Sequence, residues 1–116
     1  MQQLDTDAQP AIYAEWLQAG SHMPTVLVYA HYDVQPASIA DGWATEPFNA
    51  RIINDTFVGR GVSDCKGGLL QPLIAAEALL RTDGTIPVNL KFIFEGQEEI
   101  GSPQLEGEIY AAVLPF

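Results

Sequence analysis

Hydrophobic and polar positions along the chain predict strands separated by loops and one clear helix. In the segment 11–17, Ile12, Ala14 and Trp16 alternate with Tyr13, Glu15 and Leu17, which favours a strand. A short helix ending at Gly20 is the alternative. The run 25–30 is continuously apolar and β-branched, so it predicts a central strand buried on both faces. Residues 88–94 alternate again and predict another strand, with Ile93 adding a second apolar face.

The middle of the chain predicts a hairpin and a helix. Asn54-Asp55 tolerates positive φ and separates two short strand patterns, 50–53 and 56–58. Leucine, isoleucine and alanine recur at helical spacing over 69–81, with Pro72 at its start or at a kink. The loop before the hairpin, 37–49, is expected to be held against the rest of the domain by two aromatic side chains, Trp43 and Phe48.

The order of these elements predicts an α/β fold with a mixed, mostly parallel sheet flanked by helices. A further helix could begin within 104–113. The 116 residues suffice for one small domain, and 47% hydrophobic with 17% charged residues indicates a globular chain. We find no internal repeat and no low-complexity segment.

Charge and cysteine content exclude several functions. A formal net charge of -10 argues against binding nucleic acid or an anionic membrane, which would need clustered lysine and arginine. The single cysteine, Cys65, excludes an internal disulfide, and no run of 18 apolar residues predicts a membrane span. The first residues lack the features of a signal peptide, so a cytoplasmic location is expected.

Polar residues gather at three places where a predicted strand or turn ends. They are the pair His31 and Asp33, the residue Asp64, and the pair Glu98-Glu99. Each has an ordinary explanation, respectively a hydrogen-bonded strand end, a helix N-cap, and an exposed acidic loop. Together, at the ends of elements in one short domain, they predict a cation site, because ligands collect at strand ends in α/β folds.

Neighbouring polar residues are given simpler roles. Glu95 is assigned to the exposed acidic loop or to hydrogen bonding with backbone. Lys66 is interpreted as a solvent-facing charge, and Arg60 as the partner of a nearby carboxylate. His22 is interpreted as a loop histidine.

The motifs around these clusters resemble the zinc-dependent dipeptidase/aminoacylase family. That family includes carnosine dipeptidases, acetylornithine deacetylase, succinyl-diaminopimelate desuccinylase and carboxypeptidase G2. The resemblance covers roughly residues 11–105, and the first motif is closest to the carnosine-dipeptidase branch, which favours dipeptides over N-acyl amino acids as substrate. The three motifs, in chain order, are His31-Tyr32-Asp33-Val34-Gln35-Pro36, Gly59-Arg60-Gly61-Val62-Ser63-Asp64-Cys65-Lys66-Gly67 and Glu95-Gly96-Gln97-Glu98-Glu99-Ile100-Gly101-Ser102.

The resemblance implies a two-zinc amide hydrolase and a role for each residue of the three clusters. By this resemblance His31 is a ligand of one zinc ion, Asp33 orients His31, and Asp64 bridges the two ions. Glu98 is the general base, and Glu99 is a ligand of the second zinc. Manganese or cobalt could replace zinc. The resemblance also implies a cis Asp64–Cys65 peptide bond and gives Cys65 no catalytic role.

The chain also departs from the family pattern. No histidine follows His31, and Glu106 and Glu108 lie too close behind Glu99 to be the missing acidic ligand. The resemblance therefore implies that 1–116 is a partial catalytic domain, an internal fragment without the lid or dimerisation domain. Two hypotheses follow: a metallopeptidase whose site could be completed by ligands from another copy in a homo-oligomer, or a non-catalytic remnant that folds and binds cations weakly or not at all.

Overall fold

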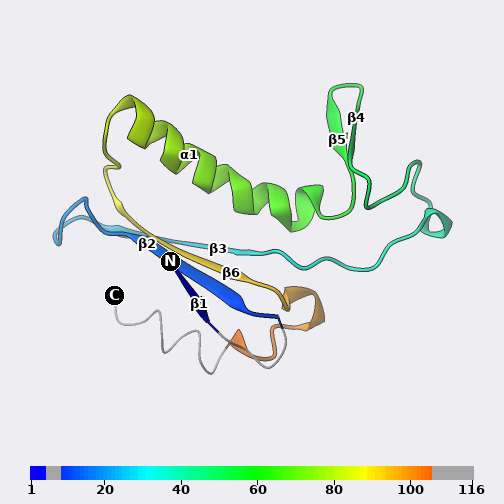
Figure 1. The fold of residues 1–116 in the computed structure, drawn as a ribbon, viewed down its shortest axis with the longest axis horizontal. Helices are drawn as coiled ribbons and strands as arrows, with labels where there is room; N and C mark the ends of the chain where they lie inside the picture. Colours follow the sequence, from blue (N-terminus) through cyan, green and yellow to red (C-terminus); the bar gives the residue numbers. More distant parts are fainter. Residues whose placement is uncertain (5–8, 106–116) are drawn as a thin grey trace.

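A four-stranded sheet forms the body of the structure, with its strands in the order β1–β2–β6–β3 (Figure 1). The strands are β1 (Gln2–Leu4), β2 (Ala11–Trp16), β3 (Thr25–His31) and β6 (Asn89–Glu95). This computed structural model describes residues 1–4 and 9–105. The strand expected over 11–17 is confirmed.

The sheet is mixed, as the sequence predicts, and the class is α/β. Strands β3 and β6 are parallel, whereas β2 runs antiparallel to both β1 and β6. Parallel strands need a long crossover, and the chain supplies one through the helix α1 (Gly68–Thr82) between β3 and β6. Among the described residues this sheet has two antiparallel strand pairs and one parallel pair, so it is mixed but not mostly parallel as the sequence predicts.

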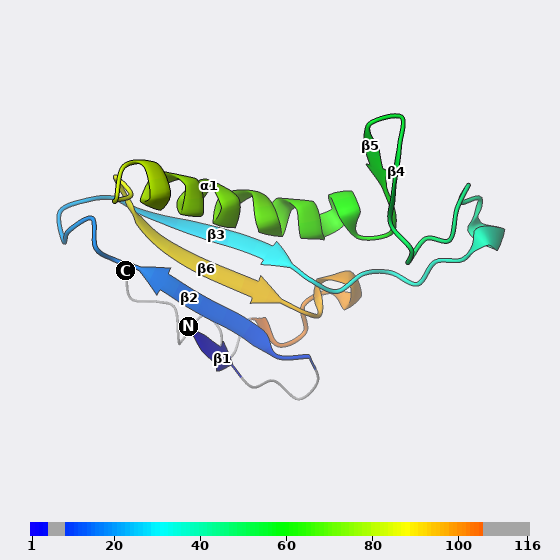
Figure 2. The same ribbon diagram turned by 45° about the horizontal axis from the view of Figure 1, so that its top comes forward.

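Helix α1 lies along the sheet (Figure 2) and confirms the helix predicted over 69–81. Pro72 is accommodated inside the helix. Leu69 packs against a buried cluster of Ala30, Phe92 and Phe94. Because successive side chains of a strand point to opposite faces, Ile93 belongs to a second cluster on the other face, with Ala11 and Tyr13.

The prediction that 25–30 forms a central strand buried on both faces is wrong for the described residues. Strand β3 lies at the edge of the sheet and pairs with β6 alone. Its apolar side chains stay partly open, with Val26 43%, Leu27 41% and Tyr29 46% exposed. The buried central strand is β6, which has neighbours on both sides.

The predicted hairpin is confirmed as β4 (Arg51–Ile53) and β5 (Thr56–Val58), with positive φ at both Asn54 and Asp55. It projects away from the four-stranded sheet (Figure 1). Of the two aromatic residues expected to pin the preceding loop, Phe48 is 63% exposed, whereas Trp43 is half-buried and contacts the Arg60 guanidinium. Pro47 is buried there.

Shorter turns complete the described chain. They are 3₁₀ turns at Ile39–Asp41 and Glu98–Ile100 and a π-helical segment, Val62–Gly67, just before α1. The helix proposed within 104–113 falls almost entirely outside the described residues. In the part of the chain that the structure describes, no helix has the length and apolar character needed to cross a membrane.

Candidate metal centre

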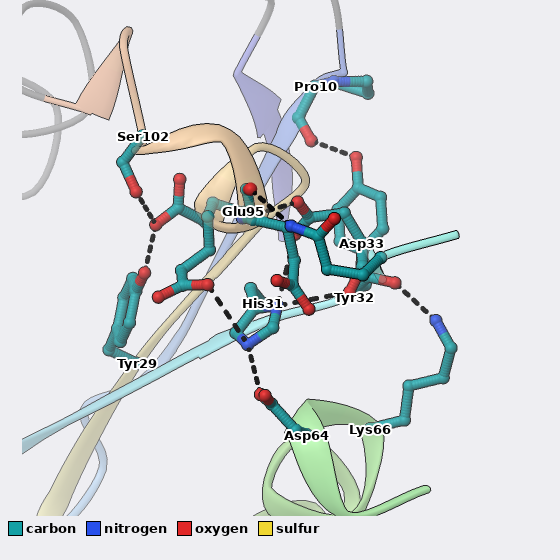
Figure 3. A network of polar contacts seen from close by, with 12 residues as sticks. Pro10, Tyr29, His31, Tyr32, Asp33, Asp64, Lys66, Glu95 and Ser102 are labelled. Carbon is teal, nitrogen blue, oxygen red and sulfur yellow. Dashed lines mark hydrogen bonds and ion pairs between the residues drawn. The ribbon is translucent and has the colours of Figure 1, made fainter. Parts of the chain in front are cut away.

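The parallel pairing of β3 and β6 brings the first and third clusters together. His31, the last residue of β3, is in register with Glu95, the last residue of β6. The turn that carries Glu98 and Glu99 follows directly. Asp64 arrives from the segment before α1, so three separate elements converge at the carboxyl ends of these two strands (Figure 3).

His31 is the centre of this arrangement and is only 5% exposed. Its Nε2 lies 2.9 Å from Asp64 Oδ1 and 3.7 Å from Glu98 Oε2. Its Nδ1 lies 3.2 Å from both the carbonyl oxygen and Oδ1 of Asp33. Both ring nitrogens therefore face carboxylates. Of the four residues expected to converge, His31, Asp64 and Glu98 lie together, whereas the contacts that place Glu99 are those of its backbone with Asp33 and Gln35.

The acidic surroundings set the protonation of His31. Burial of the ring lowers the pKa of His31, but the hydrogen bond to Asp64, the charge of Glu98 and the contacts with Asp33 outweigh it. The pKa of His31 is therefore raised above its usual value. The carboxylates that favour the protonated ring would also attract a metal cation, which would replace the proton at Nε2 because only the neutral imidazole binds metal.

Asp33 connects His31 to the third cluster. One carboxylate oxygen contacts His31 Nδ1, and the other, Oδ2, accepts a hydrogen bond from the Glu99 backbone N–H at 2.9 Å. Gln35, two residues further along the same segment, donates from Nε2 to the Glu99 carbonyl oxygen at 2.8 Å. The Glu99 residue is thus held on both sides by the segment that follows β3.

Asp64 breaks the helical backbone of the segment Val62–Gly67 that precedes α1. Its backbone is extended, with φ -120 and ψ 97, between helical residues, and the Asp64–Cys65 peptide bond is cis, as expected. The N-cap of α1 is Gly67, so the alternative that Asp64 is that cap is wrong. The Asp64 side chain is 75% exposed, and Oδ1 faces His31.

The glycines around the site allow close packing. Gly61 has φ +81, and a Cβ there would lie 2.6 Å from Val34 Cγ1. A Cβ on Gly96 would lie 2.4 Å from Tyr32 Oη, which itself donates to the Pro10 carbonyl at 2.5 Å. Any larger residue at these positions would displace the side chains of Val34 or Tyr32, which belong to the segment that follows β3.

Sequence reasoning missed several polar contacts at the site. Lys66, interpreted as a solvent-facing charge, donates from Nζ to the Tyr32 carbonyl. Arg60 places its guanidinium over the Trp43 ring, 5.4 Å from the centroid. Glu95 is buried and accepts hydrogen bonds from two side chains, Tyr29 and Ser102. Since glutamate is rarely buried, the sequence pattern held no signal for that position.

The donor set suits a divalent metal ion. Ligand atoms of His31, Asp64 and Cys65 all lie within 4.8 Å of one another. Cys65 also packs against the apolar cluster beneath α1. An imidazole whose second nitrogen is held by a carboxylate is the usual arrangement of a metal-binding histidine, and zinc accepts nitrogen, oxygen and sulfur ligands. The described residues therefore fit a divalent metal ion beside His31 Nε2.

Comparisons with known proteins identify relatives over most of the chain. The profile of Peptidase family M20/M25/M40 matches residues 27–113. The Cys-Gly metallodipeptidase dug1 of Schizosaccharomyces pombe is 49% identical over 88 residues, which is 75% of this chain and 18% of that protein. The human Beta-Ala-His dipeptidase is 43% identical over 97 residues, which is 84% of this chain and 19% of that protein.

Solved structures give the same result. The crystal structure of human carnosine dipeptidase 1 matches with a TM-score of 0.79 and 42% identity, over 89% of this chain and 22% of that one. The M20 family metallo-carboxypeptidase Sso-CP2 from Sulfolobus solfataricus matches with a TM-score of 0.83 and 40% identity, over 95% of this chain and 24% of that one. The chain thus spans about a fifth of the length of the curated relatives it matches. With a profile match over most of its length, the chain belongs to peptidase family M20/M25/M40.

Proposed function

We propose that residues 1–116 form part of the catalytic domain of a metal-dependent dipeptidase. The observation that carries the proposal is the convergence of His31, Asp64 and Glu98 at the ends of β3 and β6, with Asp33 behind the imidazole. Membership of a metallopeptidase family and the dipeptidase names of several relatives support the same reaction class.

In this proposal His31, Asp64 and Glu99 hold metal, and the complete site takes two zinc ions. Bound zinc polarises the substrate carbonyl and lowers the pKa of a bound water. Asp33 accepts the hydrogen bond from His31 Nδ1–H, which fixes the ring and directs Nε2 into the site. The same carboxylate holds the Glu99 backbone, so one residue positions two ligands.

Glu98 is the proposed general base. Its Oε2 lies 3.7 Å from His31 Nε2, inside the site, and its side chain is 44% exposed. A carboxylate that is partly open to solvent can take a proton from water and give it to the leaving amine nitrogen. Glu98 therefore combines access to substrate with closeness to the ligands.

The proposed substrates are small dipeptides, because several relatives are named as dipeptidases for Cys-Gly or Beta-Ala-His. N-acyl amino acids are the second choice. For the 116 residues by themselves the sequence favours the alternative of a non-catalytic remnant, since His22 and His31 are its only histidines. A chain with one usable imidazole could fold and bind a cation without turnover, unless a second copy or another segment supplied the missing ligand.

A chimaera tests the proposal. Residues 27–105 would replace the matching segment of the Schizosaccharomyces pombe Cys-Gly metallodipeptidase, and Cys-Gly hydrolysis and bound zinc would be measured. The proposal predicts a zinc-loaded, chelator-sensitive dipeptidase, and little or no turnover by the 116-residue chain alone. A folded, zinc-loaded chimaera without activity would show that this segment no longer supports catalysis and would favour the non-catalytic remnant.

A further inference from the structure

Glu95 is a buried acidic residue to which the proposed mechanism gives no role. It ends β6 and is 3% exposed. Its Oε1 accepts hydrogen bonds from the Tyr29 hydroxyl and, at 2.9 Å, from Ser102 Oγ. Buried carboxylates are costly unless hydrogen-bonded, so two donors on one oxygen explain how this one is tolerated.

The two donors come from different parts of the site (Figure 3). Tyr29 belongs to β3, two residues before His31, and Ser102 follows the turn that carries Glu98 and Glu99. The Glu95 carbonyl also accepts the Tyr32 N–H at 2.8 Å, which extends the pairing of the two strands by one bond. Glu95 therefore contacts the histidine strand through its side chain and its backbone.

The bond from Ser102 to Glu95 closes the segment 96–101. The backbone of this turn is closed by two further bonds: the Ser102 N–H donates to the Gln97 carbonyl at 2.9 Å, and the Gly101 N–H donates to the Glu98 carbonyl at 2.8 Å. These bonds shape the turn but do not attach it to the sheet. Its attachments to the rest of the described chain include Ser102 to Glu95 at one end and, in the middle, the Glu99 backbone to Asp33 and to Gln35.

We propose that Glu95 is a positioning residue: by accepting from Tyr29 and Ser102, its buried carboxylate anchors the turn 96–101 and holds Glu98 and Glu99 beside His31. The consequence for metal binding rests on the proposed function. The anchoring of the turn does not, because it concerns the metal-free chain.

A second tyrosine–glutamate pair in the same sheet provides a matched control. The Tyr13 hydroxyl donates to Glu15 Oε2 at 2.5 Å, within strand β2. That pair joins two residues of one strand. Removing it would cost a similar hydrogen bond without releasing the segment 96–101.

The experiment compares five variants of the full 116-residue chain: Ser102→Ala, Tyr29→Phe, Glu95→Ala, Glu95→Gln and the control Tyr13→Phe. Amide hydrogen exchange of Glu99 and Ser102 would be followed by NMR without metal, and Co²⁺ affinity by visible absorption. Losing the hydrogen bond from Ser102 should speed exchange in the turn about three- to tenfold in Ser102→Ala and weaken Co²⁺ binding similarly. Glu95→Ala loses the hydrogen bonds from both Tyr29 and Ser102, so its effect should be at least as large. Glu95→Gln keeps an acceptor oxygen and should restore most of both properties.

The outcomes separate the two claims. Unchanged exchange in Ser102→Ala and Glu95→Ala, or an equal effect of Tyr13→Phe on the turn, would overturn the role of Glu95. If Glu95→Ala fails to fold, Ser102→Ala and Tyr29→Phe decide the same question. If the unmodified chain binds no Co²⁺, the proposed function is weakened, while the exchange rates without metal still decide whether Glu95 anchors the turn.

Discussion

The carboxyl ends of β3 and β6 differ sharply from the hairpin β4–β5, although both carry aromatic and apolar residues. At the strand ends the polar side chains have partners within the described chain: His31 with three carboxylates, Asp33 with the Glu99 backbone, and Glu95 with Ser102. In the hairpin, Ile52 is 68% and Phe57 59% exposed. The site is therefore fixed by contacts among its own residues, whereas the hairpin has its apolar side chains in solvent.

This difference shows that residue type alone does not tell what a substitution will cost. Substituting a polar residue with buried partners should lower the free energy of unfolding more than substituting a large aromatic residue in solvent. The first change removes hydrogen bonds in the interior, whereas the second removes little buried area.

The largest effect is expected from Glu98→Gln in the chimaera. Glutamine keeps the shape of the side chain but cannot accept a proton, so hydrolysis should fall by about 10²–10⁴-fold, the usual contribution of a general base. Bound zinc, measured by elemental analysis, should stay unchanged. Full activity of this variant would place the base elsewhere.

A large loss of stability is expected in the interior and almost none in the hairpin. Phe94, 7% exposed, and Phe57, 59% exposed, form a matched pair for truncation to alanine. Urea unfolding should show a loss of about 3–5 kcal/mol for Phe94→Ala, from lost burial and a cavity. Phe57→Ala should change the free energy of unfolding by less than about 0.5 kcal/mol. Equal losses would mean that the hairpin is covered in solution.

Asp33→Asn should weaken metal binding without abolishing it. The amide can still contact Nδ1 but is neutral, and it no longer offers two equivalent acceptor oxygens to His31 and the Glu99 N–H. Loss of such a partner behind a metal-binding histidine costs about 10–100-fold in affinity. Isothermal titration with Zn²⁺ measures the change, and Asp55→Asn in the hairpin turn is the control. An unchanged affinity would remove Asp33 from the account.

The smallest effect concerns alkaline pH and the Tyr13–Glu15 pair. Burial, then the hydrogen bond to Glu15 and its charge, raise the pKa of Tyr13 to about 12 from 10.0. A pKa raised by folding stabilises the protein below the unfolded value, and the benefit is lost as pH rises from 10 to about 12. Urea unfolding at pH 9, 10 and 11 should show this decline, reduced in Tyr13→Phe. An identical decline in both proteins would contradict the assignment.

The sequence predicted the members of the site better than their surroundings. The motifs placed His31, Asp33 and Glu98 correctly at or just after the ends of β3 and β6, because parallel strands carry their carboxyl-terminal residues to one edge. The edge position of β3 was missed, since an apolar run shows what a strand can tolerate, not which strands lie beside it. Glu95 was missed because a buried acidic residue is recognisable only from its donors, which come from residues 29 and 102.

The central claim is that His31, Asp64 and the turn bearing Glu98 and Glu99 form a metal centre. The most direct test is anomalous diffraction at the zinc absorption edge from crystals of the chain grown with Zn²⁺. The account predicts a strong peak between His31 Nε2 and the Asp64 carboxylate, absent in His31→Ala crystals. A peak only at His22, or no peak at the ends of β3 and β6 in zinc-saturated crystals, would contradict it.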